Sequence, residues 1–170
     1  MNTALIAESF IASGSVGSAT GQLVSIQRDP ERAAAAGGSR GSIQLRYHSL
    51  QLVPVDLIDE VPGIWAALLD VVESFLAEGT GQGRYPGLDA EIVLQTTGGI
   101  AKFTAGKVRH IVDTGELIDA ILGGAAAYHH FAGTCQPRIA ELRSQVSAAG
   151  ISAQGERAAH PWAPRRNLGE

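Results

Sequence analysis

The clearest hydrophobic pattern along the chain lies between residues 62 and 78. Apolar side chains recur there at spacings of three and four, which is the period of one face of an α-helix. The apolar positions are Trp65, Leu68, Leu69, Val72, Phe75 and Leu76, and the polar ones are Asp70, Glu73, Ser74 and Glu78. Gly79 follows where a left-handed residue commonly ends a helix. The pattern predicts an amphipathic helix of about four turns whose apolar face is buried.

A second helix is predicted over residues 114–132. Asp113 precedes it as an N-cap, and Glu116 stands at the third helical position, where an acid completes a capping box. Gly123 and Gly124 interrupt this helix, and each glycine costs about 1 kcal/mol relative to alanine in a helix interior. Their presence indicates that another element approaches closely there.

A third helix is predicted to begin with Pro137 at its first position. Ile139, Leu142 and Val146 form its apolar face. Gly150 follows as a left-handed stop, and Ile151 stands where it can pack on Val146 in a Schellman ending. These signals place the end of the helix just before residue 150.

Alternating and β-branched segments predict strands before and between these helices. Short strands near residues 90–96, 100–104 and 108–112 are separated by glycine-containing turns and predict a meander. The glycine-rich segment 79–87 before them is predicted to be a mobile connection. It does not fit a phosphate-binding loop, because it leaves the partly negative end of a helix, feeds a strand and offers one base, Arg84.

The N-terminal third of the chain gives weaker signals. Residues 4–11 are predicted to form a strand, and the segments 20–27 and 42–53 are predicted to pair with each other as antiparallel strands. Between them, Asp29 followed by proline predicts either a two-turn helix ended by Gly37 or an irregular tip. The expected fold class is therefore α+β, with an antiparallel sheet made of an N-terminal hairpin and a central meander, covered by three helices.

The length of 170 residues is ordinary for one domain, so residues 1–151 are predicted to form a single domain and residues 152–170 a flexible tail. The single cysteine, Cys135, excludes an internal disulfide. The net charge of −4 is far from the basic balance of a nucleic-acid binder. No apolar segment matches a signal peptide or a membrane span, so we expect a cytoplasmic protein without a membrane partner. The bias toward arginine, alanine and glycine indicates a GC-rich bacterial genome.

The acidic residues are concentrated in the middle of the chain. Residues 56–119 contain eleven acids and four bases, a balance of −7, whereas both ends are mildly basic. Asp70, Glu73 and Glu78 are expected on the exposed face of the helix at 62–78. Their simplest interpretation is a solvated helix face, and the alternative is a surface that docks a basic protein. The second interpretation suits a small non-catalytic binding protein of the antitoxin or immunity type.

A different hypothesis rests on His110, His129 and Cys135. If the meander packs on the helix at 114–132, these side chains could line a pocket between sheet and helix, as in a small-molecule-binding protein or a hydrolase. A structural, hydrogen-bonded histidine is the simpler interpretation of each. One cysteine and scattered histidines supply no local ligand set, so neither a metal nor another cofactor is expected.

Overall fold

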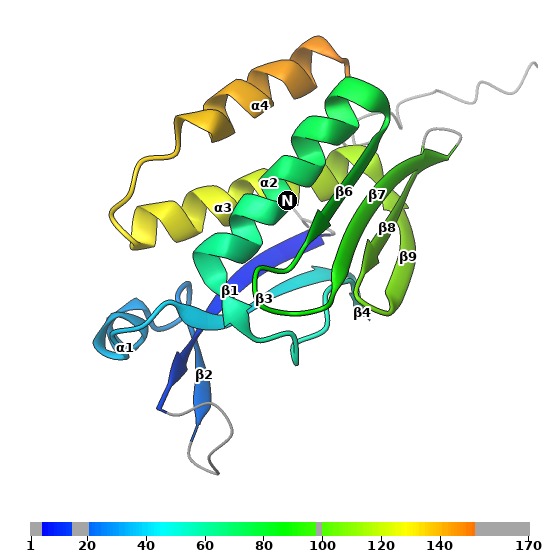
Figure 1. Ribbon diagram of the computed structural model, residues 1–170. Coiled ribbons are helices and arrows are strands. Elements are labelled where there is room, and N and C mark those ends of the chain that lie inside the picture. The colour runs from blue at the N-terminus through cyan, green and yellow to red at the C-terminus, as the bar shows by residue number, and fades with distance from the viewer. Residues whose placement is uncertain (1–4, 15–20, 98–99, 152–170) are drawn as a thin grey trace, which may run out of the picture.

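The computed structural model describes residues 5–14, 21–97 and 100–151 (Figure 1). Over these residues the chain forms two antiparallel sheets, named here sheet A and sheet B, and four helices. Sheet A contains β1 (Leu5–Ser13), β2 (Gln22–Ser25), β3 (Arg40–Tyr47), β4 (Leu50–Gln51) and β5 (Asp59–Glu60). Sheet B contains β6 (Thr80–Arg84), β7 (Glu91–Thr97), β8 (Ile100–Ala105) and β9 (Val108–Asp113). The helices are α1 (Pro30–Ala35), α2 (Val61–Glu78), α3 (Thr114–Phe131) and α4 (Pro137–Ala148).

The predicted α+β class is confirmed. The described residues contain the three predicted helices and, in addition, the short helix α1. The N-cap of α1 is Asp29, whose side chain accepts a hydrogen bond from the backbone amide of Arg32. Gly37 follows with a φ of 70°, a conformation that glycine adopts without steric cost. The structure thus contains the helix, and not the irregular tip, at this position.

Sheet A has the strand order β2-β1-β3-β4, with β5 also paired to β3. The nine-residue β1 lies between β2 and β3, so that Ile11 is opposite Val24 and Ala7 is opposite Leu45. The predicted direct pairing of segments 20–27 and 42–53 is therefore wrong, because β1 takes the position between them. The second segment also reverses at His48, which has a φ of 53°, and so forms two strands, β3 and β4.

Sheet B is a meander in the order β6-β7-β8-β9. The three predicted strands are confirmed as β7, β8 and β9, but β6 lies inside the segment predicted as a mobile connection. The reason is close packing of α2 on β6. A Cβ atom at Gly81 would lie 2.0 Å from the backbone oxygen of Val71, and one at Gly83 would lie 2.8 Å from that residue's side chain. The glycines that suggest a loop are the residues that let a helix lie directly on a strand.

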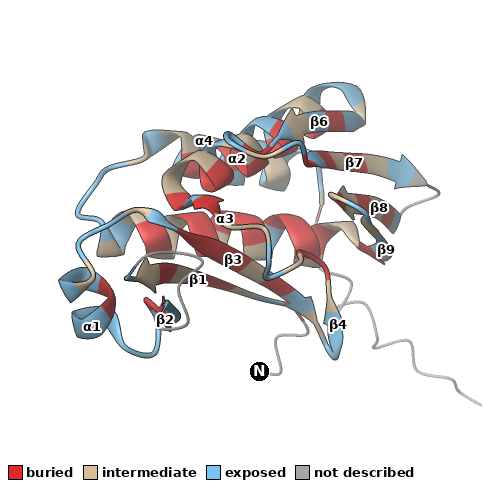
Figure 2. Cartoon of the chain, turned by 60° about the horizontal axis from the view of Figure 1, so that its bottom comes forward, coloured by how far each residue is buried: buried red, intermediate tan, exposed pale blue. Residues whose placement is uncertain are grey.

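Helix α2 lies between the two sheets: it packs mainly on β6 and β7 of sheet B and also contacts β1, β3 and β5 of sheet A. Helix α3 packs on β1, and α4 packs against both α2 and α3 (Figures 1 and 2). A Cβ atom at Gly124 would lie 2.4 Å from the Trp65 ring and 2.7 Å from Ala7, so the predicted close approach is confirmed there. Gly123 has nothing within 4 Å of the same position, so its presence has another cause.

The helix ends follow the local signals in the sequence. Asp113 accepts a hydrogen bond from the Glu116 amide at 2.9 Å, which confirms the predicted cap of α3. After α4, Gly150 has a φ of 67° and the Ile151 amide donates to the Val146 oxygen at 3.2 Å, which confirms the Schellman ending.

The buried side chains of both sheets and of α2, α3 and α4 belong to one hydrophobic cluster. It contains the predicted core residues of α2, namely Trp65, Leu68, Leu69, Val72 and Phe75. No helix in the described part of the chain is long and apolar enough to span a membrane. The predicted tail at 152–170 lies outside the described residues.

Candidate functional site

The predicted docking residues lie on one exposed side of α2. Asp70, Glu73 and Glu78 are all exposed, and the apolar face of the helix is buried. This arrangement follows from the helical period, which places the acidic residues on one face of the helix and the apolar residues on the opposite face. The folded chain therefore keeps these three carboxylates at its surface.

Helix α4 changes the character of this surface by bringing a base to it. The guanidinium of Arg138, at the start of α4, lies 2.6 Å from Asp70 Oδ1 and also pairs with Glu73 Oε2. Burial alone would lower the pKa of Arg138, but hydrogen bonds and charge attraction from the two carboxylates outweigh burial and raise it. This contact could not be predicted from the sequence, because Arg138 and Glu73 are 65 positions apart along the chain.

The two ion pairs leave both carboxylates accessible. Asp70 and Glu73 share one guanidinium, and their side chains remain 61% and 53% exposed. Glu78 makes no ion pair with any residue that the structure describes. We call Asp70, Glu73 and Glu78 together the acidic α2 surface.

Two of the three alternative pocket residues line one groove. His129, at the end of α3, and Cys135, just before α4, border an open groove of about 470 Å³ between these helices. His130, Thr134 and Arg143 also line it. Both helices contribute to this groove, whereas the expected pocket lay between the sheet and α3.

His129 is held by a local hydrogen bond. Its Nδ1 lies 2.7 Å from Thr134 Oγ1, and partial burial lowers the pKa of the imidazole. Cys135 is an exposed free thiol that precedes Gln136, the residue at the N-cap of α4. An imidazole, a thiol and the Arg143 guanidinium suit a polar or anionic small molecule better than an apolar one.

His110 lies elsewhere in the fold. It is on β9 opposite Phe103 and shares the inner face of sheet B with it. The 18 residues of α3 separate β9 from the groove at His129, and a helix of that length spans about 27 Å. His110 is therefore not part of the groove that contains His129 and Cys135.

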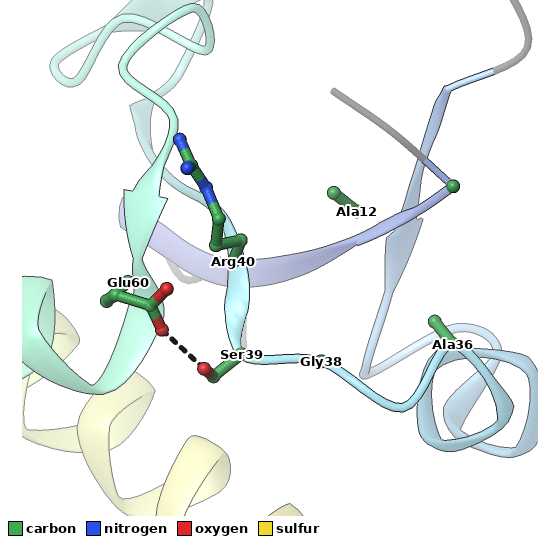
Figure 3. Close-up of a pocket in the computed structure, with 7 residues that line it drawn as sticks. Ala12, Ala36, Gly38, Ser39, Arg40 and Glu60 are labelled. Atoms are coloured by element: carbon green, nitrogen blue, oxygen red, sulfur yellow. Dashed lines mark hydrogen bonds between the residues drawn. The ribbon is translucent and has the colours of Figure 1, made fainter. Parts of the chain in front are cut away.

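One further groove was not predicted from the sequence. It is an open groove of about 730 Å³ between the ends of β1 and α1 and the start of β3 (Figure 3). Its lining residues are Ala12, Gly14, Ala36, Gly38, Ser39, Arg40 and Glu60. The Ser39 hydroxyl donates a hydrogen bond to the Glu60 carboxylate, while Ala12 and Ala36 border the other side (Figure 3). Most of these side chains are small, and no sequence signal distinguishes them from ordinary loop residues.

A buried acid in sheet A was also not identified from the sequence. Glu8 is 6% exposed, and it accepts hydrogen bonds from Ser25 Oγ at 2.5 Å and from Arg28 Nη2 at 2.8 Å. The one available signal was a charged residue inside an otherwise apolar strand. Because its oxygens are taken by neighbours in the fold, Glu8 has a structural role.

No cluster of three or more histidine, cysteine, aspartate or glutamate side chains in the described ranges could hold a metal ion. Comparisons with protein-family models, with curated protein sequences and with solved structures gave no match to this chain.

Proposed function

We propose that this chain is a small protein-binding module that docks a basic protein through the acidic α2 surface. The observation that carries the proposal is that Asp70, Glu73 and Glu78 stay exposed on one side of α2, with two of them held in place by Arg138. This surface is formed by a regular helix, so its carboxylates have defined positions.

The Arg138 contacts support docking by reducing its entropic cost. A long side chain that is ordered on binding loses about 0.5–1.5 kcal/mol of conformational free energy. One carboxylate oxygen of Asp70 and one of Glu73 already contact the guanidinium of Arg138. The other two oxygens, Asp70 Oδ2 and Glu73 Oε1, make no ion pair in the described part of the structure. These two oxygens are available to lysine or arginine side chains of a partner, and the net negative charge increases the rate of encounter.

The experiment compares the wild type with the triple variant Asp70→Asn, Glu73→Gln and Glu78→Gln. Proteins captured from cell extract by both are quantified by mass spectrometry, and association rates are then measured with each purified protein that prefers the wild type. We expect the variant to associate more slowly and to depend less on salt, because exposed charges are screened over about 8 Å at physiological ionic strength.

The control removes two exposed acids elsewhere, one in the connection between β6 and β7 and one at the start of β7. Asp89→Asn with Glu91→Gln eliminates the carboxylates that pair with Arg84. This control should bind like the wild type. Equal association rates and equal salt dependence for the wild type and the triple variant would show that the acidic α2 surface is only a solvated helix face.

A second function is favoured by the groove between α3 and α4. His129 and Cys135 both line it, so a base and a nucleophile of the kinds that a small-molecule-binding protein or a hydrolase uses border the same groove. A library of polar and anionic compounds, screened by thermal shift, tests this proposal. Compounds that stabilise the wild type but neither His129→Gln nor Cys135→Ser support it, and compounds that stabilise all three proteins equally count against it.

A further inference from the structure

Among the residues that the structure describes, strand β9 is an edge strand of sheet B, paired with β8 alone. It ends the strand order β6-β7-β8-β9, and at six residues it is longer than β2, β4 and β6, the other strands that end a sheet. In Figures 1 and 2 no described segment runs along its outer side. Within the described ranges, the backbone groups of β9 that point away from β8 therefore pair with no other strand, as in an edge open to pairing.

The outer face of β9 carries an apolar residue between two opposite charges. In the register with β8, Arg109 is opposite Thr104, Ile111 is opposite Lys102, and Asp113 is opposite Ile100. Side chains alternate along a strand, so Arg109, Ile111 and Asp113 share one face. Ile111 is 63% exposed, more than any other large apolar side chain in the described part of the molecule.

Apart from the charges of Arg109 and Asp113, this edge lacks the features that usually prevent strands from pairing across molecules. Proline, a bulge, a very short strand or a covering segment serves that purpose in most sheets. The sequence of β9 is Val-Arg-His-Ile-Val-Asp, without proline or glycine, and its register with β8 is unbroken from Val108 to Asp113. Three of its six residues are β-branched, which favours an extended strand.

We propose that β9 pairs antiparallel with β9 of a second copy of this chain, about a two-fold axis at Ile111. Residues directly opposite in a continuous sheet share a face, so the outer residues 109, 111 and 113 must meet outer residues of the second copy. Centring the pair on Ile111 places it against its own equivalent. It also places each Arg109 opposite Asp113 of the second copy, and pairing about Arg109 would instead oppose like charges.

The charge pattern is the reason for choosing a second copy over an unrelated strand. A base two residues before Ile111 and an acid two residues after it make the strand complementary to itself about that residue. One oxygen of Asp113 caps α3, and the carboxylate has a second oxygen that can accept from the guanidinium. A single pair of six-residue strands buries little area, so the dimer is expected to be weak and to dissociate on dilution.

The test measures the size of the full chain by sedimentation velocity over a wide concentration series. We expect the wild type to shift toward a dimer as concentration rises. Arg109→Asp and Asp113→Arg should each remain monomeric, because each places like charges opposite each other. An equimolar mixture of the two variants should dimerise, since the acids at positions 109 and 113 of one then face the bases of the other.

Two further variants serve as controls. Asp113→Asn removes the charge but keeps a side chain that can cap α3. If its circular dichroism matches that of the wild type, any weaker dimerisation of this variant is due to the lost charge pair and not to a lost cap. Ile6→Asp places an acid on an exposed apolar residue of sheet A, 44% exposed, and should leave the dimer unchanged. In hydrogen exchange, the amides of Arg109–Asp113 should gain protection as concentration rises.

A wild type that stays monomeric at the highest concentration would overturn the proposal. So would a dimer that survives in Arg109→Asp, or a mixture of charge variants that stays monomeric although each is folded. This inference uses no residue of the acidic α2 surface, so its outcome is independent of the proposed function.

Discussion

The two sheets of this protein differ in what their interiors contain. All five buried polar residues in the described part of the chain belong to strands of sheet A: Glu8, Ser9, Ser25, Ser42 and Asp59. Apart from the half-buried His110, the inner face of sheet B is apolar, with Ile92, Leu94, Ala101, Phe103, Ala105 and Val112 buried. Sheet A therefore combines apolar packing with specific hydrogen bonds, whereas sheet B depends on close apolar contact.

Helix α2 shows the same difference on its two sides. Toward sheet A, the Trp65 indole donates a hydrogen bond to Ser9 Oγ at 3.0 Å. Toward sheet B, the backbone at Val71 lies against Gly81 with no room for a side chain. Helix α2 is thus fixed to the two sheets by different means. A hydrogen bond sets its position on sheet A, and close-fitting shape alone sets its position on sheet B.

The largest effect is expected where both sheets depend on one residue. Leu69 on α2 is fully buried in the cluster that joins them. Leu69→Ala should reduce the free energy of unfolding by about 2–5 kcal/mol, because it loses apolar burial and leaves a cavity. Urea denaturation measures this loss. An unchanged midpoint would mean that the apolar side of α2 is not the shared core.

The close contact of sheet B is tested at Gly81. Gly81→Ala places a methyl group 2.0 Å from a backbone oxygen of α2, so the helix or β6 must move, at a cost of about 1–3 kcal/mol. Gly123→Ala is the matched control, because that helical position has open space and alanine favours a helix. The two melting temperatures should move in opposite directions. If Gly81→Ala is neutral, shape does not fix α2 on sheet B.

The polar contacts of sheet A are tested at Glu8. Glu8→Gln keeps the volume but removes the charge that Arg28 and Ser25 bind, so a loss of about 1–2 kcal/mol in the free energy of unfolding is expected. The exposed Glu73→Gln, which weakens an ion pair at the surface, should cost less than about 1 kcal/mol. Similar losses for both variants would remove the distinction between buried and surface acids on which the comparison depends.

The smallest effect is expected outside both sheets, at His129. Burial lowers its pKa in the folded chain, so the unfolded chain takes up the proton first as pH falls through the ordinary histidine range. Protonation of His129 therefore lowers the free energy of unfolding as the pH falls through this range, and it has no effect on stability at higher pH. Denaturant titrations at neutral and mildly acidic pH should give a weaker pH dependence for His129→Gln than for the wild type.

The difference between the sheets also explains how well each could be predicted. The strands β7, β8 and β9 are short segments rich in aliphatic and β-branched residues, and glycine-containing turns separate them, so the local pattern was sufficient to predict them. In β1, the buried Glu8 and Ser9 interrupt that pattern, and their partners Ser25 and Trp65 are distant in sequence. The local signal is weak wherever burial is achieved through polar contacts, because such residues resemble surface positions.

The candidate sites also differ in how much of each could be predicted from the sequence. The exposure of Asp70, Glu73 and Glu78 followed from the helical period alone. The pairing of Arg138 with the acidic α2 surface did not, since it depends on how α4 crosses α2. The groove that joins His129 to Cys135 and excludes His110 likewise depends on the packing of α3 against α4.

The sequence by itself determined the elements whose causes are local: three helices with their caps, the Schellman ending at Gly150, and the strands of the meander. These depend on residues three or four positions apart, or on side chains that alternate along one strand. Only the tertiary structure decided that β1 lies between β2 and β3, and that the glycines at 81 and 83 form a strand beneath α2. Both outcomes depend on which distant surfaces pack together, and no local period or cap records that choice.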